Sequence, residues 1–303
     1  MHTSKYSIQP PEYRTGTAGI NRGVLVVLLC GLLCMIGAVT LVANAASSNL
    51  VPARPPQPAT SNYVPPSTPT NASSPVSQTP TAPDQTSQIA VKPFNYPVFY
   101  GNTHLPEIAL TFDDGPNPVY TPQILAILRA YHIQATFFDV GYLVKDFPDI
   151  VRQEFLQGNS IGNHSWSHPD LTKLSAQGIV SQLVNTSNAI QSVTGTRPTI
   201  FRPPYGSFNR VVIAQAFQQN LTTILWNDES HDWTTPGVTV IVHGILTLAR
   251  NGGIILLHDG GGFRAQTVAA LPLIIDALQQ RGFTFVTIPQ LLHDTAASGK
   301  SSP

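Results

Sequence analysis

The sequence predicts an α/β domain organised around a mainly parallel sheet. Seven short apolar or β-branched runs recur between residues 108 and 288, and helix-like segments lie between most of them. Polar residues capable of chemistry follow several of these runs. A sheet closed on itself would be a barrel of about seven strands, whereas an open sheet would be doubly wound, and periodicity alone does not separate the two.

The expected strands share a high content of apolar or β-branched residues and are four to six residues long. Such lengths are typical of strands buried in a parallel sheet. In chain order they are Ile108–Phe112, Ala135–Val140, Ser160–Asn163, Thr199–Arg202, Thr222–Trp226, Gly253–His258 and Phe283–Ile288.

The expected helices begin at capping residues or prolines, and several end at a glycine. They run from Thr121-Pro122 to Tyr131, from Pro148 to Gln157, from the Ser175 cap to Gly195, from the Asn209 cap to about Gln219, from Thr235-Pro236 to near Gly252, and from Thr267 to Gln280, with Pro272 near the start of the last one.

The N-terminal zone of the chain predicts a membrane anchor. Residues 1–23 form a mildly basic head, and Val24–Ala43 then gives twenty residues without a charge, a length that suits a membrane span. Because the basic residues precede the span, we expect the head in the cytoplasm and the rest of the chain outside, at the cell membrane. A cleaved signal is the alternative, since Ala43-Asn44-Ala45 fits a cleavage pattern, and it would make the protein secreted.

The remainder of the chain predicts a linker followed by one domain. Residues 44–91 contain ten prolines between Pro52 and Pro83 and only two charges, so we expect a disordered linker. Residues 92–294 suit a single domain, and residues 295–303 a flexible tail. The formal net charge of all 303 residues is zero, so no basic surface argues for a nucleic-acid partner.

Two adjacent carboxylates, Asp113 and Asp114, follow the first strand run and precede a Gly-Pro turn. The carboxyl ends of strands carry the chemistry of α/β enzymes, although Asp-Gly-Pro is also an ordinary turn sequence. His164 and His168 follow the third run, and a loop there would let both imidazoles reach one ion. One carboxylate and two imidazoles leave positions open for water and substrate, which is typical of a catalytic metal site.

Two further strand ends carry polar groups that would share this rim. Arg202 would lie level with the acids and could orient one of them, and Tyr205, after two prolines without N–H groups, offers a free backbone donor for an oxyanion. His258 ends the sixth run. An acceptor at Asp232 would fix the tautomer of His258 and increase its basicity, so this histidine could protonate a leaving group.

These segments, in this order, resemble the polysaccharide deacetylases of the NodB-homology type, carbohydrate esterase family 4. The likeness covers roughly residues 94–292. Five motifs carry it: Thr111-Phe112-Asp113-Asp114-Gly115-Pro116, His164-Ser165-Trp166-Ser167-His168, Arg202-Pro203-Pro204-Tyr205-Gly206, Asp232-Trp233 and Leu256-Leu257-His258. One departure is Glu229, at a position where the family's fourth motif usually has Asp.

The resemblance implies a distorted (β/α)7 barrel and hydrolytic removal of acetyl groups from sugars. It also implies a role for each matched residue. Asp113 would be the general base, Asp114, His164 and His168 the metal ligands, Arg202 the group that orients Asp113, the Tyr205 N–H an oxyanion donor, Asp232 the partner of the general acid His258, and Trp233 and Leu256 the lining of the acetyl pocket.

We therefore expect a metal-dependent enzyme that removes N-acetyl groups from polysaccharide containing N-acetylglucosamine, such as peptidoglycan or a chitin-like glycan, and releases acetate. Two alternatives stay open: an O-acetyl esterase acting on xylan or exopolysaccharide, and a surface protein that binds glycan without catalysis. Two imidazoles and one carboxylate suit Zn²⁺ best, with Co²⁺, Ni²⁺ and Mn²⁺ as alternatives.

Overall fold

The computed structural model describes residues 92–299. The head, the apolar run and the linker predicted for residues 1–91 lie outside the described residues, as do residues 300–303 of the predicted tail. Within residues 92–299, none of the helices combines the length and hydropathy that a membrane crossing requires.

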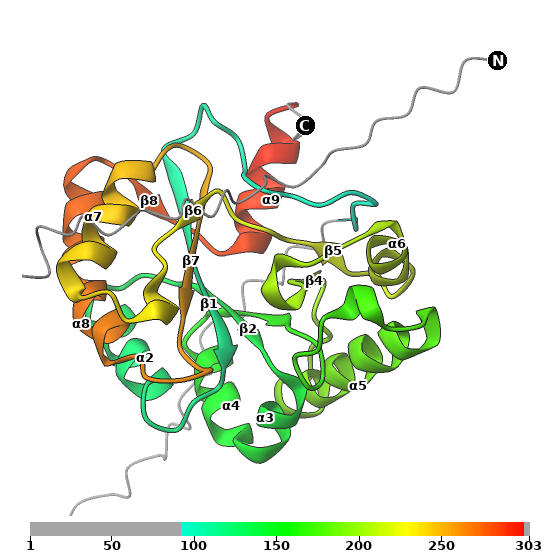
Figure 1. Ribbon diagram of the computed structural model, residues 1–303. Coiled ribbons are helices and arrows are strands. Elements are labelled where there is room, and N and C mark those ends of the chain that lie inside the picture. The colour runs from blue at the N-terminus through cyan, green and yellow to red at the C-terminus, as the bar shows by residue number, and fades with distance from the viewer. Residues whose placement is uncertain (1–91, 300–303) are drawn as a thin grey trace, which may run out of the picture. The chain divides into compact units, whose positions relative to one another are not determined.

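Eight strands form one curved sheet, in the order β5-β4-β3-β2-β1-β7-β6, with β8 beside the start of β1 (Figure 1). All of their pairings are parallel. In the described part of the chain β5 and β6 do not pair with each other, so the sheet is an open half-barrel. The strands are β1 Glu107–Gly115, β2 Thr136–Asp139, β3 Ser160–Asn163, β4 Ile200–Phe201, β5 Thr222–Thr223, β6 Asp228–Glu229, β7 Gly253–His258 and β8 Thr284–Phe285.

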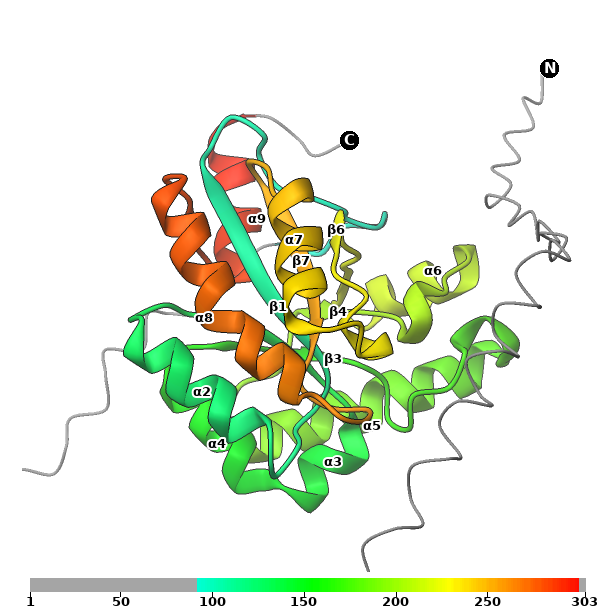
Figure 2. The same cartoon turned by 60° about the vertical axis from the view of Figure 1, so that its left-hand side comes forward.

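Helices cover the outside of this sheet. In Figure 1, α2, α7 and α8 gather on one side of β1 and β7, and α3, α4 and α5 lie together on another side. Figure 2 places α9 near the start of β1. The helices are α2 Thr121–Ala130, α3 Gly141–Asp146, α4 Pro148–Leu156, α5 Ala176–Thr194, α6 Arg210–Gln218, α7 Val238–Leu248, α8 Ala265–Gln280 and α9 Ile288–Ala297.

Alternation along β1 determines which side chains face the helices and which face the interior. Ile108, Leu110 and Phe112 pack into the main apolar cluster with residues of α2, α7 and α8. Ala109 belongs instead to the inner cluster, which α9 helps to fill. Because successive side chains of a strand point to opposite faces, Asp113 lies on the inner face, at the carboxyl end of the strand.

The predicted parallel α/β architecture is confirmed, and several expected helix boundaries are also correct. Helix α5 begins after Ser175, whose Oγ accepts from the Gly178 N–H at 3.2 Å, and it ends at Gly195 in a left-handed conformation (φ 76°). Helix α6 begins after Asn209, whose side chain accepts from two backbone N–H groups of the first turn. These caps lie in the sequence itself, which is why they were predictable.

The start of α2 differs from the prediction. Tyr120, not Thr121, occupies the N-cap position. The Thr121 hydroxyl accepts from the Asn117 N–H at 2.8 Å and donates to the buried carboxylate of Asp259. The Thr121 hydroxyl, which the local sequence predicts to cap the helix, is therefore used in a tertiary contact with Asp259 instead.

The last three helices also depart from the prediction. Helix α7 begins after Gly237, because Thr235 is left-handed (φ 54°) and ends a preceding 3₁₀ turn. Helix α8 begins at Ala265, so Pro272 lies in its middle. The run expected as a strand over residues 283–288 divides, because Thr287 caps a new helix with a proline in its first turn. That helix, α9, continues to Ala297, three residues beyond the expected domain limit.

Candidate active site

The site begins where β1 and β7 end side by side. Their parallel register pairs Asp113 with His258 directly, so the two residues expected to act as base and acid are neighbours across the ladder. Leu256 lies two residues before His258 in β7 and is buried. Because of the two-residue period, Leu256 and His258 point to the same face of the sheet.

Arg202 fills the interior of the half-barrel behind Asp113. Its side chain is fully buried, and its Nη1 donates to Asp113 Oδ1 and to Thr111 Oγ1, both at 2.7 Å. Its guanidinium carbon lies 4.2 Å from the centre of the Phe138 ring. Its Nε and Nη2 donate to the backbone carbonyls of residues 224 and 225. A buried cation held by four hydrogen bonds keeps the carboxylate of Asp113 in one orientation.

Asp114, His164 and His168 bring one potential ligand atom each into a group that spans no more than 4.8 Å. Asp114 Oδ1 lies 3.4 Å from His164 Nε2 and 3.0 Å from His168 Nε2. The histidines lie on a tight loop, as expected, in which Ser165 and His168 adopt left-handed conformations (φ 66° and 56°). The Ser165 Oγ accepts from the His168 N–H at 3.0 Å and so fixes the loop.

The chemistry of this donor set fits a divalent metal ion. His164 Nδ1 lies 2.8 Å from the carbonyl oxygen of Arg202. Because a carbonyl only accepts, Nδ1 carries the hydrogen and Nε2 is free to coordinate, an arrangement common among metal-bound histidines. Burial acts to raise the pKa of Asp114, but the hydrogen bonds and charges of His164 and His168 lower it well below its usual value, so its carboxylate is ionised.

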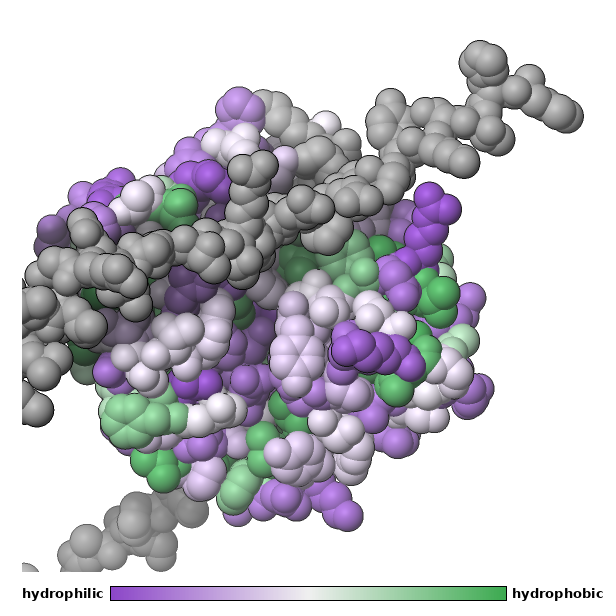
Figure 3. Space-filling view, viewed as in Figure 1, coloured by the Kyte–Doolittle hydropathy of each residue, from purple (hydrophilic) through white to green (hydrophobic). Residues whose placement is uncertain are grey.

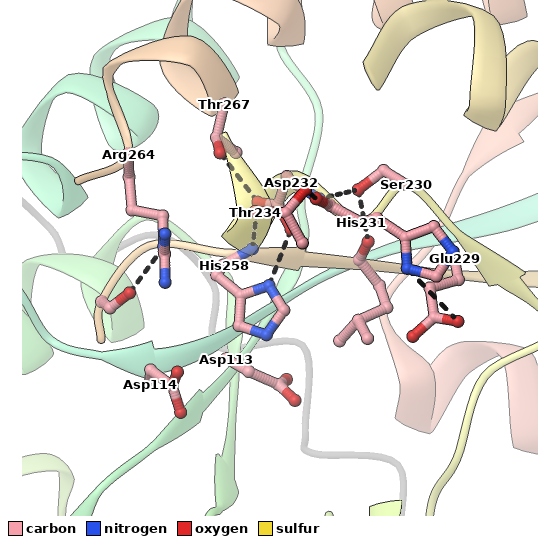
Figure 4. Close-up of polar contacts among 12 residues, drawn as sticks. Asp113, Asp114, Glu229, Ser230, His231, Asp232, Thr234, His258, Arg264 and Thr267 are labelled. Carbon is pink, nitrogen blue, oxygen red and sulfur yellow. Dashed lines mark hydrogen bonds and ion pairs between the residues drawn. The ribbon is translucent and has the colours of Figure 1, made fainter. Parts of the chain in front are cut away.

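A buried network positions His258. Its Nδ1 lies 2.8 Å from Asp232 Oδ1, and its backbone N–H donates to Asp232 Oδ2 at 2.9 Å. Thr267 donates from its hydroxyl to the same Oδ2 atom at 2.7 Å. Figure 4 shows the His258 ring between Asp232 on one side and Asp113 and Asp114 on the other.

The electrostatic environment suits His258 to donate a proton. Burial alone would lower the pKa of this imidazole. The hydrogen bond and charge of Asp232, with the charges of Asp113 and Asp114, outweigh that effect and raise the pKa above its ordinary value. A histidine with a raised pKa keeps its proton near neutral pH, which a general acid requires.

Aromatic side chains surround these groups. Tyr205 is 70% exposed, has a left-handed backbone (φ 61°), and contacts the His168 ring edge-to-face, with 4.7 Å between ring centres. Within residues 92–299, the Tyr205 N–H donates to no protein acceptor. Trp233 is partly exposed and lies edge-to-face against His258, at 5.3 Å between ring centres.

Two further acidic residues, Glu229 and Asp139, lie at the edge of the site or outside it. Glu229 pairs through β6 with Leu256, and its carboxylate lies 3.9 Å from His231 Nδ1. Asp139 accepts from the His164 N–H through its backbone carbonyl at 2.9 Å. Its buried side chain lies near Glu154, and burial raises the pKa of Asp139 to about 7.

Sequence reasoning missed the roles of two threonines and of a run of glycines. Thr111 was named only as the first residue of a motif, and Thr267 lies in none, yet Thr111 accepts from Arg202 and Thr267 donates to Asp232. The glycines Gly260 and Gly261 bring the chain against Asp114. Three consecutive glycines directly after His258-Asp259 were a signal that could have been used.

Comparisons with known proteins agree with this geometry. A family model described as polysaccharide deacetylase matches residues 100–224. A peptidoglycan-N-acetylglucosamine deacetylase of Bacillus cereus is 41% identical over 187 residues, which cover 61% of this chain and 87% of the relative. A chitooligosaccharide deacetylase of Sinorhizobium fredii is 38% identical over 199 residues, which cover 62% of this chain and 93% of the relative.

Solved structures give the same result. The crystal structure of a peptidoglycan N-acetylglucosamine deacetylase in complex with a hydroxamate-type benzamide has a TM-score of 0.64 and 33% identity, and covers 69% of this chain and 95% of that one. A wild-type CE4 family pseudoenzyme of Bacillus anthracis has a TM-score of 0.62 and 29% identity, and covers 65% of this chain and 69% of that one. Deacetylases and a pseudoenzyme therefore share this fold. The fold alone does not distinguish a catalytic from a non-catalytic protein, and the side chains of the site are needed to do so.

Proposed function

Because the chain belongs to the polysaccharide deacetylase family of hydrolases, carbohydrate esterase family 4, we propose that it removes N-acetyl groups from polysaccharide containing N-acetylglucosamine in a metal-dependent reaction that releases acetate. The observation that carries this proposal is the pairing of Asp113 with His258 beside the cluster of Asp114, His164 and His168. The substrates in the names of two relatives, peptidoglycan N-acetylglucosamine and chitooligosaccharide, support the substrate class.

In the proposed reaction Asp113 and His258 each carry out one proton transfer. Asp113, oriented by Arg202, takes a proton from the attacking water. Water adds to the acetyl carbonyl, and the Tyr205 N–H donates to the oxygen that gains negative charge. His258 gives its proton to the departing nitrogen, so the C–N bond breaks and leaves acetate and a free amine.

Asp114, His164 and His168 would hold the metal ion of this reaction. A divalent ion there would act as a Lewis acid toward water and the acetyl carbonyl. We propose Zn²⁺, because two imidazole nitrogens and one carboxylate oxygen form a donor set that zinc enzymes use and that leaves coordination positions open. Co²⁺, Ni²⁺ and Mn²⁺ also accept these donors and are the alternatives to test.

The proposal extends to where the enzyme acts. Residues 24–43 would anchor the chain in the cell membrane, and residues 44–91 would tether residues 92–294 outside it, close to wall glycan. Membrane fractionation of the full chain, with N-terminal sequencing of the mature protein, tests this arrangement. A soluble extracellular protein beginning near Asn44 would replace the anchor with a cleaved signal.

One assay separates the proposed activity from its two alternatives. Acetate release is measured from N-acetylglucosamine oligomers, peptidoglycan and acetylated xylan in parallel. Release from the N-acetylated substrates supports the deacetylase, and release from xylan alone supports the esterase. No release from any substrate, with binding retained, supports a non-catalytic protein like the pseudoenzyme relative.

A further inference from the structure

The segment that follows His258 passes directly against Asp114, one of the proposed metal ligands. Asp259 and Gly260 both donate their N–H groups to the carbonyl oxygen of Asp113, at 3.1 and 3.3 Å. A Cβ atom on Gly261 would lie 2.3 Å from Asp114 Oδ2, so only glycine permits this approach. Phe263 follows two residues later, within about 7 Å of chain length from that contact.

Phe263 is an exposed aromatic residue at this place, with 58% of its surface accessible. Its ring lies 6.0 Å from the ring of Tyr120, at 83°, in an edge-to-face pair. Tyr120 comes from a different segment, immediately before α2. Two loops at the carboxyl end of the sheet, after β1 and after β7, therefore contribute one ring each to a single aromatic surface.

The backbone beneath both rings is fixed. Arg264 is 4% exposed, and its guanidinium donates to the carbonyl oxygens of Gly260 (2.7 Å) and Phe263 (3.0 Å). The Asn117 side chain accepts from the Tyr120 N–H at 3.0 Å. Because these hydrogen bonds already hold the loops in place, binding of a ligand over the rings costs little conformational entropy.

We propose that Tyr120 and Phe263 form an aromatic platform that binds a neighbouring sugar of the glycan chain, one that is not itself deacetylated. The inference rests on the proposed function, because it takes the substrate to be a polysaccharide. Sugar rings present C–H groups on their faces, and these pack well on aromatic surfaces. Binding energy gained away from the reacting acetyl group can hold the polymer in register for catalysis.

A glycan suits this surface better than a membrane or a protein partner does. Docking of those partners usually requires a contiguous apolar patch of several hundred Å². Among the coloured residues of Figure 3, the hydrophobic ones are scattered between polar ones. The two rings lie on the loops that follow Asp114 in β1 and His258 in β7, and Tyr205 and Trp233 add exposed rings near His168 and His258.

The test compares short and long substrates in the full-length protein. We measure kcat/KM for acetate release from the dimer and the pentamer of N-acetylglucosamine in wild type, Phe263→Ala and Phe263→Tyr. In Phe263→Ala the pentamer-to-dimer ratio should fall about tenfold, the effect of losing roughly 1.4 kcal/mol of stacking. Phe263→Tyr should retain the ratio, because it retains the ring.

The matched control is Phe217→Ala, which removes another exposed phenylalanine, on α6, and should leave the ratio unchanged. An unchanged ratio in Phe263→Ala, or an equal loss on dimer and pentamer, would overturn the platform. Calorimetric binding of the pentamer to Asp113→Asn, with and without Phe263→Ala, tests it without turnover. If wild type releases no acetate from any substrate but pentamer binding still depends on Phe263, the platform is supported while the proposed function fails.

Discussion

The guanidinium of Arg202 lies 2.7 Å from Asp113 Oδ1, although the two residues are 89 positions apart. Both are buried, and the other carboxylate oxygen of Asp113 lies 3.8 Å from His164 Nε2. One oxygen is thus held by the arginine, and the other is directed toward the proposed metal site. A carboxylate constrained in this way suits a general base, because its free oxygen needs no reorientation before it accepts a proton.

Replacing Asp113 with Asn should nearly abolish catalysis. An amide cannot accept the proton from water, so we expect kcat to fall about 10²–10⁴-fold with little change in metal content. Acetate release under saturating substrate, with metal analysis of the same sample, checks this. Asp146→Asn, an exposed aspartate at the end of α3, is the matched control. Full activity in Asp113→Asn would remove this residue from the mechanism.

Replacing His168 with Ala should weaken metal binding directly. The change removes one of the three proposed ligand atoms, and we expect zinc affinity to fall at least about 10–100-fold, the loss typical even for partners outside the ligand set. Competition with a chromogenic chelator measures this without an activity assay. His243→Ala, at an exposed position on α7, serves as the control. Unaltered zinc affinity in His168→Ala would place the ion elsewhere.

Replacing Asp232 with Asn should move the pH profile. Asp232 helps to raise the pKa of His258, so in wild type this proposed general acid stays protonated to a higher pH than an ordinary histidine does. Activity is lost as the pH rises through that pKa. Without the carboxylate the pKa falls, and the alkaline limb of kcat/KM should move to lower pH. An alkaline limb at the same pH in both proteins would mean that another group is the acid.

Replacing Asp228 with Asn should stabilise the fold at alkaline pH. Asp228 is buried at the start of β6, and its carboxylate oxygens have no hydrogen-bond partner within the described residues. Burial raises its pKa from 3.8 to about 7, partly offset by Arg250. Between about pH 4 and pH 7 the Asp228 carboxyl is ionised in the unfolded chain but stays protonated in the folded protein. The free energy of unfolding of the wild type therefore falls as the pH rises through this range.

In Asp228→Asn the side chain at this position is an amide, which does not ionise in this pH range. Its Tm should exceed that of wild type by several degrees near about pH 8, with a much smaller difference near about pH 4. Thermal unfolding followed by circular dichroism at both pH values measures the two differences. A difference of the same size at both pH values would show that ionisation of Asp228 is not the cause.

The sequence predicted the parts of the fold that depend on local signals. Ser175 and Gly195 bound α5 as expected, because a cap and a left-handed glycine act within one turn. Local signals failed where a tertiary contact prevailed. Thr121 donates to Asp259 instead of capping α2, and Pro272 lies inside α8, where packing of the helix on the core outweighs the lost hydrogen bond.

The residues of the candidate site also divide into those that the sequence predicted and those that it did not. The motifs named the residues that the structure brings together, because paired acids and spaced histidines at strand ends carry a recognisable pattern. Thr267 and Phe263 lie outside these motifs and carried no such pattern. Thr267 reaches Asp232 across 35 positions, and Phe263 meets Tyr120 from another loop, so only the three-dimensional arrangement reveals them.

The proposed metal-dependent deacetylation is measured as acetate release from the pentamer of N-acetylglucosamine. The full-length protein is assayed as prepared, after removal of metal by a chelator, and after addition of Zn²⁺. We expect release that falls to background on chelation, returns with Zn²⁺, and does not return in His168→Ala at matched zinc concentration. Release that continues at full rate in the metal-free protein would contradict this proposal.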